Sequence, residues 1–206
     1  SQARSTLRLP CSGQVVALLP GSRNTEVEAL AARLIGSAHW LAARRSPLSF
    51  VVPLISDSTH ERFVRALHAS PGPGVFKLIR GDARTAMAAA DVVLLASGTA
   101  TLEALLIGRP MVITYRTHPL TWAIGRRMLN VDYVGLPNLL AGRPLVAELL
   151  QDAGSSQRLG AEVLALLDCA QARSSQVGEF AAIAATLRNN ASECAADAIA
   201  EVIAFK

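Results

Sequence analysis

Two stretches of the sequence combine the residue types that bind phosphorylated ligands. Residues 20–26 (PGSRNTE) place a glycine, for close backbone approach, beside a hydroxyl, a guanidinium and a carboxylate. Residues 96–103 (ASGTATLE) place small residues ahead of Glu103. Both stretches would open a helix, where unpaired amides and the helix dipole attract an anion. We therefore expect a nucleotide site with two phosphate-facing turns, in which Glu103 accepts hydrogen bonds from both ribose hydroxyls.

Neither turn has the sequence of the common nucleotide-binding loops. Residues 20–26 lack the Gly-Lys-Ser/Thr ending of an ATPase loop, and neither stretch has the three spaced glycines of a dinucleotide-binding turn. ATPases and dehydrogenases are therefore disfavoured. Each residue alone also has a structural interpretation: the glycines would permit tight turns, Ser22 and Thr25 would cap a helix, and the charged side chains would be solvated. The prediction depends on the combination.

The elements expected around these turns would bring them together. Short apolar runs alternate with helix-length segments, which is typical of a parallel sheet with helices on both faces. The expected strands are residues 15–19, 50–54, 75–79, 92–95 and 111–115. Thr25 and Glu28 have the spacing of a capping box for the first long helix. Ligands of such α/β proteins bind outside the carboxyl ends of the strands, which is where residues 20–26 and 96–103 fall.

The alternating pattern ends after residue 115. A possible helix at 120–129 is followed by an irregular stretch up to Arg143 and then by three Ala- and Leu-rich helical segments. The irregular stretch contains residues 132–143 (DYVGLPNLLAGR), which are rich in turn-forming and apolar residues. Asn138 could offer donors and an acceptor to a base or sugar, and Arg143 could bind phosphate bidentately. An ordered surface loop, with Asn138 capping the next helix, stays open as the alternative.

Composition narrows the class of protein and of partner. The hydrophobic fraction of 51% and the charged fraction of 17% exclude a disordered chain. Three scattered cysteines match neither a disulfide framework nor a zinc site, and no acidic or histidine cluster has metal-ligand spacing, so we expect a reducing cytoplasm and no cofactor. The net charge of +4 favours anionic partners. Nucleic acid is disfavoured because the arginines are dispersed and no basic strand carries aromatic residues.

Four phrases of the sequence, taken as a set, resemble the lipid-A-disaccharide synthase family. They are residues 18–23 (LLPGSR) with 26–28 (EVE), 94–103 (LLASGTATLE), 111–116 (MVITYR), and 136–143 (LPNLLAGR) with 148–150 (ELL). The Ser-Gly-Thr turn with a later glutamate is shared by many B-type glycosyltransferases, whereas the set is specific to this family. The resemblance extends from about residue 15 to about residue 202.

The resemblance implies an organisation for the chain. Residues 15–170 would form a Rossmann-like domain, the C-terminal, UDP-sugar-binding half of the two-domain B-type glycosyltransferase fold. Residues 1–14 would be a linker from an N-terminal half that this sequence lacks. Residues 171–206 would form helices that pack on the sheet or cross to the partner domain. A homodimer is also possible.

The resemblance also implies an activity and a set of site residues. The family inverts the anomeric carbon as it transfers 2,3-diacylglucosamine from UDP to lipid X, which is 2,3-diacylglucosamine 1-phosphate, to form a β-1,6 disaccharide and UDP. The residues expected to bind the UDP-sugar are Gly21, Ser22, Arg23, Glu26, Ser97, Gly98, Thr99, Glu103, Tyr115, Asn138 and Arg143. The family's proposed general-base aspartate lies in the N-terminal half, so the catalytic residues are unknown in this chain. We therefore expect this chain to bind UDP but to catalyse no turnover alone.

A peripheral position at the inner membrane is the expected location, in the cytoplasm. No apolar run is long enough to span a bilayer and the sequence does not begin with the pattern of a signal peptide. Between residues 115 and 129, three arginines are interleaved with apolar residues and could lie on an anionic membrane surface. The alternative is a helix with its apolar face in the core and its arginines solvated.

Two other functions stay open at this point. Another UDP-sugar enzyme of the B-type fold, such as a UDP-N-acetylglucosamine 2-epimerase or a peptidoglycan glycosyltransferase, would share the Ser-Gly-Thr turn but is not expected to carry residues 136–143. A non-catalytic nucleotide-sugar-binding module would bind UDP without a partner half that restores activity.

Overall fold

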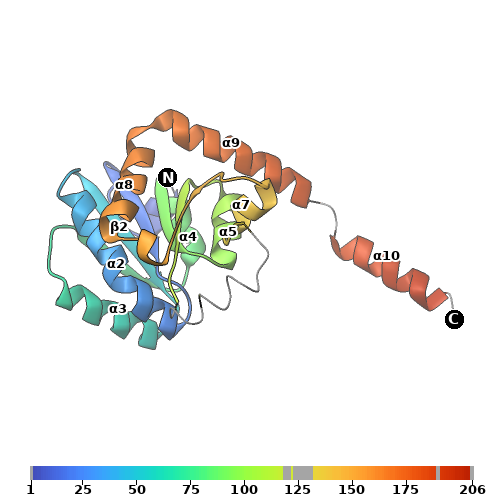
Figure 1. Ribbon diagram of the computed structural model, residues 1–206, viewed down its shortest axis with the longest axis horizontal. Coiled ribbons are helices and arrows are strands. Elements are labelled where there is room, and N and C mark those ends of the chain that lie inside the picture. The colour runs from blue at the N-terminus through green and yellow to red at the C-terminus, as the bar shows by residue number, and fades with distance from the viewer. Residues whose placement is uncertain (1, 118–121, 123–131, 189–190, 205–206) are drawn as a thin grey trace.

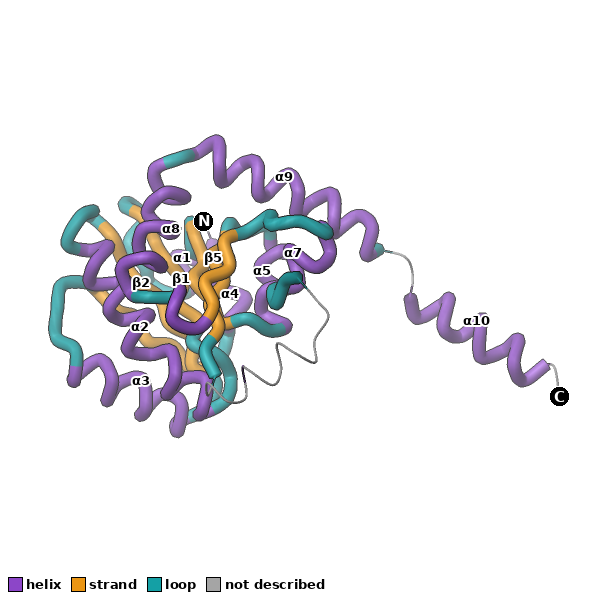
Figure 2. Tube along the Cα trace, in the orientation of Figure 1, coloured by secondary structure: helices purple, strands orange, loops and turns teal. Residues whose placement is uncertain are grey.

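Six parallel strands form one sheet at the centre of the molecule (Figures 1 and 2). The computed structural model describes residues 2–117, 122, 132–188 and 191–204. The strands are β1 (Gln14–Leu19), β2 (Leu48–Leu54), β3 (Val75–Arg80), β4 (Val92–Ala96), β5 (Met111–Tyr115) and β6 (Ala147–Leu150). The helices are α1 (Gln2–Thr6), α2 (Asn24–Ala42), α3 (Asp57–Ala69), α4 (Ala83–Ala89), α5 (Thr99–Ile107), α7 (Leu136–Ala141), α8 (Ser156–Asp168), α9 (Ala170–Leu187) and α10 (Ala191–Ala204). The predicted parallel α/β sheet is confirmed.

Helices cover both faces of the sheet because its central strands are apolar on both faces. In β1, Val16 and Leu18 pack into a core with α2 and α8, whereas Val15, Ala17 and Leu19 pack into a second core with α4 and α5. This alternation follows from the two-residue repeat of a strand. The apolar run of β1 is continuous because each of its successive residues is buried in one or the other of these two cores.

The order of the strands determines where a ligand can bind. The sheet runs β3-β2-β1-β4-β5-β6, so the chain moves outward in one direction from β1 and then returns to the other side of β1 with β4. Leu19 and Leu95 lie side by side at the carboxyl ends of these two strands. The turns that follow them, at 20–26 and 96–103, therefore diverge from neighbouring points. A crevice at such a reversal is the usual ligand site of open α/β sheets.

The segment after β5 differs from the prediction in two places. The stretch expected to be irregular contains the short helix α7, which begins with a proline near its first position and ends at Gly142. The region expected to be helical after Arg143 begins instead with strand β6, which pairs in parallel with β5. Only Leu149 of β6 is buried, so its four residues carry too little apolar pattern to predict a strand. The possible helix at 120–129 lies outside the described residues, except for Trp122.

The residues before β1 and helix α9 pack on the domain, whereas α10 does not. The stretch predicted as a linker forms α1 and packs on the sheet: Leu7 and Leu9 are buried, and Arg4 binds the Asp91 carboxylate at 2.7 Å. Helix α9 buries Phe180 in the core beside α5. Helix α10 extends away from the sheet in Figure 1. It exposes its apolar side chains Ile199, Val202 and Ile203.

Candidate functional site

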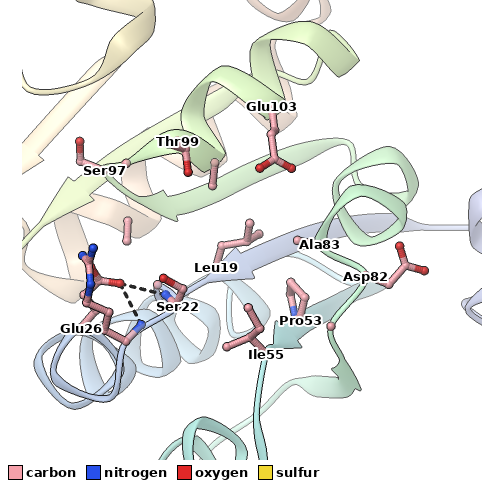
Figure 3. Close-up of a pocket in the computed structure, with 16 residues that line it drawn as sticks. Leu19, Ser22, Glu26, Pro53, Ile55, Asp82, Ala83, Ser97, Thr99 and Glu103 are labelled. Atoms are coloured by element: carbon pink, nitrogen blue, oxygen red, sulfur yellow. Dashed lines mark hydrogen bonds and ion pairs between the residues drawn. The ribbon is translucent and has the colours of Figure 1, made fainter.

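A cavity of about 550 Å³ opens between the carboxyl ends of β1 and β4. The turns after these strands form two of its walls (Figure 3). All eight residues that were predicted on the two turns line it, namely Gly21, Ser22, Arg23, Glu26, Ser97, Gly98, Thr99 and Glu103. The strand order therefore brings together two groups of residues that are more than seventy positions apart in the sequence.

The β4–α5 turn leaves its backbone amides available. The Ser97 amide donates to the Thr114 carbonyl at 2.8 Å, which fixes the start of the turn to β5. The next three amides, of Gly98, Thr99 and Ala100, donate to no other described residue. Gly98 has φ +154° and ψ −164°, a conformation that only glycine adopts readily, and a Cβ there would meet nothing within 4 Å. The turn is therefore an open group of donors at a helix N-terminus.

Glu103 stands one helical turn beyond these amides. Figure 3 shows its carboxylate pointing from α5 into the space between that helix and the loop that carries Asp82 and Ala83. The side chain is exposed and has no hydrogen bond or ion pair with any residue that the structure describes. Both carboxylate oxygens are thus free to accept hydrogen bonds from a ligand that is bound at the Gly98 turn.

The β1–α2 turn has the opposite arrangement. Glu26 folds back over the start of α2, and its Oε2 accepts hydrogen bonds from the amides of Ser22 at 2.9 Å and Arg23 at 3.2 Å. Its Oε1 accepts from Arg23 Nη1 at 2.8 Å. In this structure an internal carboxylate therefore already bonds the amides of the first turn, and phosphate binding at this turn stays a prediction. The helix cap is also Arg23 with Glu26, and not the predicted pair Thr25 and Glu28.

Gly21 explains how the carboxylate fits into this turn. Its φ is +111°, and a Cβ at this position would lie 2.6 Å from the Cβ of Glu26 and still closer to its Oε2. No side chain can therefore share this space with Glu26. The absence of a Cβ at Gly21 therefore allows the Glu26 side chain to lie against this turn.

A third wall of the cavity was not predicted from the sequence. It consists of Pro53 near the end of β2 and of four residues that follow β2 and β3, namely Ile55, Gly81, Asp82 and Ala83. Ile55 is 66% exposed, which is unusual for a large apolar side chain and gives the cavity an apolar surface. Asp82 has a positive φ of 47° and caps α4 by accepting from the Thr85 amide at 3.2 Å. Residues 80–82 follow a predicted strand, so the carboxyl-end rule applied to every strand would have indicated them.

The predicted ligands from the later segment do not line the cavity. Tyr115 ends β5 with its ring 6.4 Å from that of Trp122. Arg143 forms an exposed ion pair with Glu179 of α9 at 2.6 Å. Asn138 is 1% exposed: its Nδ2 donates to the Val146 carbonyl, and its Oδ1 accepts from two backbone amides. These contacts give Asn138 a structural role in this conformation.

Asn138 belongs to a network that supports the open turn. Its Nδ2 also donates to the Glu148 carboxylate at 2.7 Å, and that carboxylate accepts from the amides of Val134 and Gly135. The Val134 carbonyl in turn accepts from the Ser97 hydroxyl at 3.0 Å. The segment around α7 is therefore connected by hydrogen bonds to the first residue of the Gly98 turn.

The described residues contain no group of three or more His, Cys, Asp or Glu side chains that could hold a metal ion. No helix among them has the length and hydropathy that a bilayer crossing requires. The predicted membrane-facing arginines at 126 and 127 lie outside the described residues, whereas Arg116 is exposed.

Comparison with known sequences decides the family. The sequence model of the family described as lipid-A-disaccharide synthetase matches residues 1–202. The chain belongs to the lipid-A-disaccharide synthase family. It is 47% identical over 201 residues to the lipid-A-disaccharide synthase of Pseudomonas aeruginosa strain UCBPP-PA14, a match that covers 98% of this chain and 52% of the relative. The enzyme of the same name from Methylobacillus flagellatus is 46% identical over 203 residues and is covered to 53%. The chain spans about half the length of the curated relatives it matches.

Solved structures place this domain of the lipid-A-disaccharide synthase family in the B-type glycosyltransferase fold. The calicheamicin glycosyltransferase superposes with a TM-score of 0.60 at 15% identity, over 93% of this chain and 42% of the other. WaaG, a glycosyltransferase involved in lipopolysaccharide biosynthesis, superposes with a TM-score of 0.57 at 16% identity, over 87% and 44%. A UDP-GlcNAc 2-epimerase from Neisseria meningitidis superposes with a TM-score of 0.55 at 15% identity, over 92% of this chain and 48% of the epimerase chain. Since epimerases share the fold, the fold does not distinguish the enzyme classes, and the family is shown by the sequence match.

Proposed function

We propose that this chain is the sugar-nucleotide-binding half of a lipid-A-disaccharide synthase. The whole enzyme would transfer 2,3-diacylglucosamine from UDP to lipid X, with inversion at the anomeric carbon, and would release UDP. The observation that carries the proposal is the open Gly98 turn with the unpaired Glu103 carboxylate beside it, at the strand reversal of a chain that belongs to this family.

The cavity suggests how UDP would lie. Its diphosphate would accept hydrogen bonds from the amides of Gly98, Thr99 and Ala100, at the positive end of the α5 dipole. The ribose would donate both hydroxyls to Glu103. The uracil would then extend toward the third wall, where the apolar surface of Ile55 suits the face of a base and the backbone of residues 81–83 offers polar groups to its edge.

The same geometry supports the expectation that this chain does not catalyse transfer alone. An inverting transfer needs a base to deprotonate the acceptor hydroxyl as it attacks. Of the carboxylates that line the cavity, Glu26 is bonded to Ser22 and Arg23, and Glu103 is assigned to the ribose. Asp82 caps α4. The base would come from the part of the relatives' length that this chain does not cover, and that part would also complete the acceptor site.

Location and lipid partners follow from the proposed substrates. Both the donor and lipid X carry acyl chains, so the enzyme would work in the cytoplasm at the surface of the inner membrane. Exposed Arg116 and the neighbouring Trp122 are of the residue types that lie at an anionic lipid surface. Cosedimentation with vesicles should rise with their content of anionic lipid, and binding that ignores this content would contradict a basic membrane-facing surface.

Calorimetric titration of the purified chain with UDP, UMP and ADP tests the donor site. Saturable 1:1 binding of UDP is expected, because the open turn can bind both phosphates. UMP should bind at least about tenfold more weakly, since it lacks the hydrogen bonds of the second phosphate. ADP should also bind more weakly, because its purine would not fit the pocket wall in the same way. A well-folded chain that binds no UDP would contradict the proposal.

A turnover assay tests the division of labour. The chain alone, incubated with UDP-diacylglucosamine and lipid X, should form no disaccharide detectable by mass spectrometry, whereas the complete enzyme should form it. Disaccharide formation by the chain alone would mean that a base is present among its own residues.

A further inference from the structure

The Glu26 carboxylate occupies the position that an anion would take at the start of α2. Two neighbouring amides, those of Ser22 and Arg23, donate to one of its oxygens, and the Arg23 guanidinium donates to the other. This is the donor set that binds a phosphate oxygen at a helix N-terminus, with a basic side chain added. Here the anion is part of the protein.

The space around Gly21 gives independent support for this arrangement. The volume that a Cβ of Gly21 would take is filled by the side chain of Glu26, whereas the corresponding volume at Gly98 is empty. The two turns line the same cavity and each has a glycine with a positive φ. Only one of them has its amides bonded to a carboxylate of the same chain.

A free phosphate would compete poorly with this carboxylate. Glu26 is attached to the first turn of α2, so it binds the amides without the loss of translational and rotational freedom that a phosphate in solution must undergo. A phosphate that approached the turn would also meet the negative charge of Glu26.

Arg23 is held less firmly than the carboxylate. Its side chain is 79% exposed, whereas that of Glu26 is 21% exposed. An exposed ion pair can exchange partners easily. The guanidinium can therefore turn toward a phosphate at the Gly98 turn while Glu26 stays on the two amides.

We propose that Glu26 is a specificity-determining residue: it closes the β1–α2 turn to phosphate and thereby confines the diphosphate of the donor to the β4–α5 turn. The identity of the donor rests on the proposed function, but the closure of the first turn does not. Confinement matters because Glu103 lies beside the Gly98 turn, so only a diphosphate bound there would place its ribose on Glu103.

The first experiment titrates the ¹⁵N-labelled chain with inorganic phosphate and follows its backbone amides by NMR. In the unmodified chain, phosphate should shift the amides of Ser22 and Arg23 only slightly, because both stay bonded to Glu26. In Glu26→Ala these two amides should shift strongly on addition of phosphate. The dissociation constant for phosphate, fitted from the shifts of these amides, should be at least about tenfold lower in Glu26→Ala than in the unmodified chain. Glu28→Ala is the matched control, because it removes the same charge from the same helix but contacts Arg62 instead of the turn.

Glu26→Gln is a second variant that tests the proposal even if Glu26→Ala does not fold. Its amide oxygen can still accept from the two backbone amides but carries no charge, so phosphate should compete better than in the unmodified chain and less well than in Glu26→Ala. Phosphate-induced shifts of the Ser22 and Arg23 amides in the unmodified chain that are as large as those in Glu26→Ala would overturn the proposal. So would their absence in folded Glu26→Ala.

The same spectra keep this proposal distinct from the proposed function. The amides of Gly98, Thr99 and Ala100 report on the open turn, and phosphate should shift them in every variant. If they stay unchanged in all proteins, the donor site is in the wrong place, while Ser22 and Arg23 still decide the role of Glu26. Titration with UDP should give the same result as phosphate. The amides of Gly98, Thr99 and Ala100 should shift in every variant, and those of Ser22 and Arg23 should shift strongly only when Glu26 is replaced.

Discussion

The turns that follow β1 and β4 differ in what fills the space beside their glycines. Gly21 makes room for the Glu26 side chain, which bonds the amides of its turn, whereas Gly98 faces an empty volume and leaves three amides without a partner among the described residues. Both sequences have a glycine followed by a hydroxyl residue within two positions and a glutamate five residues after the glycine. Similar residues at similar spacing therefore produce one closed turn and one open turn.

The two turns are also held in place in different ways. The closed turn is stabilised locally, by a carboxylate three residues into the same helix. The open turn depends on remote partners: Ser97 contacts β5 through its amide and the segment before α7 through its hydroxyl. A turn that must present free amides cannot use its own residues to satisfy them, so its conformation has to be fixed from outside.

Substitution of Gly98 should have the largest effect on the open turn. In Gly98→Ala the new Cβ projects into the space where phosphate must approach the amides, and φ +154° disfavours any L residue. The dissociation constant for UDP should rise at least about 100-fold, or about 3 kcal/mol, by calorimetry.

Gly142→Ala is the control for the backbone strain that alanine causes at a glycine with positive φ. Gly142 has φ +64° and open space for a Cβ, but it caps α7 and does not line the cavity. Urea unfolding should show a loss of roughly 1 kcal/mol or more in both variants, while only Gly98→Ala loses UDP binding. Equal UDP affinity in the two variants would mean that the Gly98 turn is not the phosphate site.

Glu103→Ala should produce the next largest effect. The carboxylate is proposed to accept two charge-assisted hydrogen bonds from the ribose, so UDP should bind roughly 30-fold more weakly, or about 2 kcal/mol. The unmodified chain should prefer UDP over 2′-deoxy-UDP, and the variant should lose that preference. Glu162→Ala, at an exposed position on α8, removes an equal charge. It should change neither the affinity for UDP nor the preference for UDP over 2′-deoxy-UDP. A preference for UDP that survives in Glu103→Ala would place the ribose elsewhere.

A double-mutant cycle between Gly21 and Glu26 tests the closed turn. Gly21→Ala alone should destabilise the chain by about 2 to 3 kcal/mol, because the Cβ overlaps Glu26 and φ +111° is strained. In the Glu26→Gly background both the carboxylate and the Cβ of residue 26 are gone and only the strain remains, so the cost should fall to about 1 kcal/mol and leave a coupling of about 1 to 2 kcal/mol. Urea unfolding of the four proteins measures this coupling. Additive effects would show that the carboxylate does not fill that space.

Most of the fold could be predicted from the sequence, because the central strands are continuous apolar runs whose burial follows from their composition. Strand β6 could not, since it exists through its pairing with β5 and buries only Leu149. The packing of the first residues on the domain could not be predicted either. Arg4 and Asp91 are far apart in the sequence, and no local pattern indicates that they pair.

The site could be predicted at the level of elements but not at the level of side-chain conformations. The carboxyl-end rule placed both turns at one cavity. Whether Glu26 points to solvent or folds back onto Ser22 depends on the space left by Gly21, which the order of residues does not reveal. Asn138 was expected to contact a ligand because of the family resemblance, whereas its chemistry alone left a structural role open, and in the structure its amide bonds β6 and Glu148.

Replacement of Arg23 should have the smallest effect. It tests whether a side chain of the closed turn contributes to UDP binding at the open turn. Arg23→Ala should leave the free energy of unfolding within about 0.5 kcal/mol, because its ion pair with Glu26 is exposed. UDP should bind about three- to tenfold more weakly in low salt, since one cation that could reach the diphosphate is lost, and the difference should shrink as salt screens it. Arg65→Ala, exposed on α3, makes the same change in net charge and should leave UDP binding unchanged. If both variants weaken binding equally, the overall field of the protein attracts UDP, and Arg23 has no specific place beside the open turn.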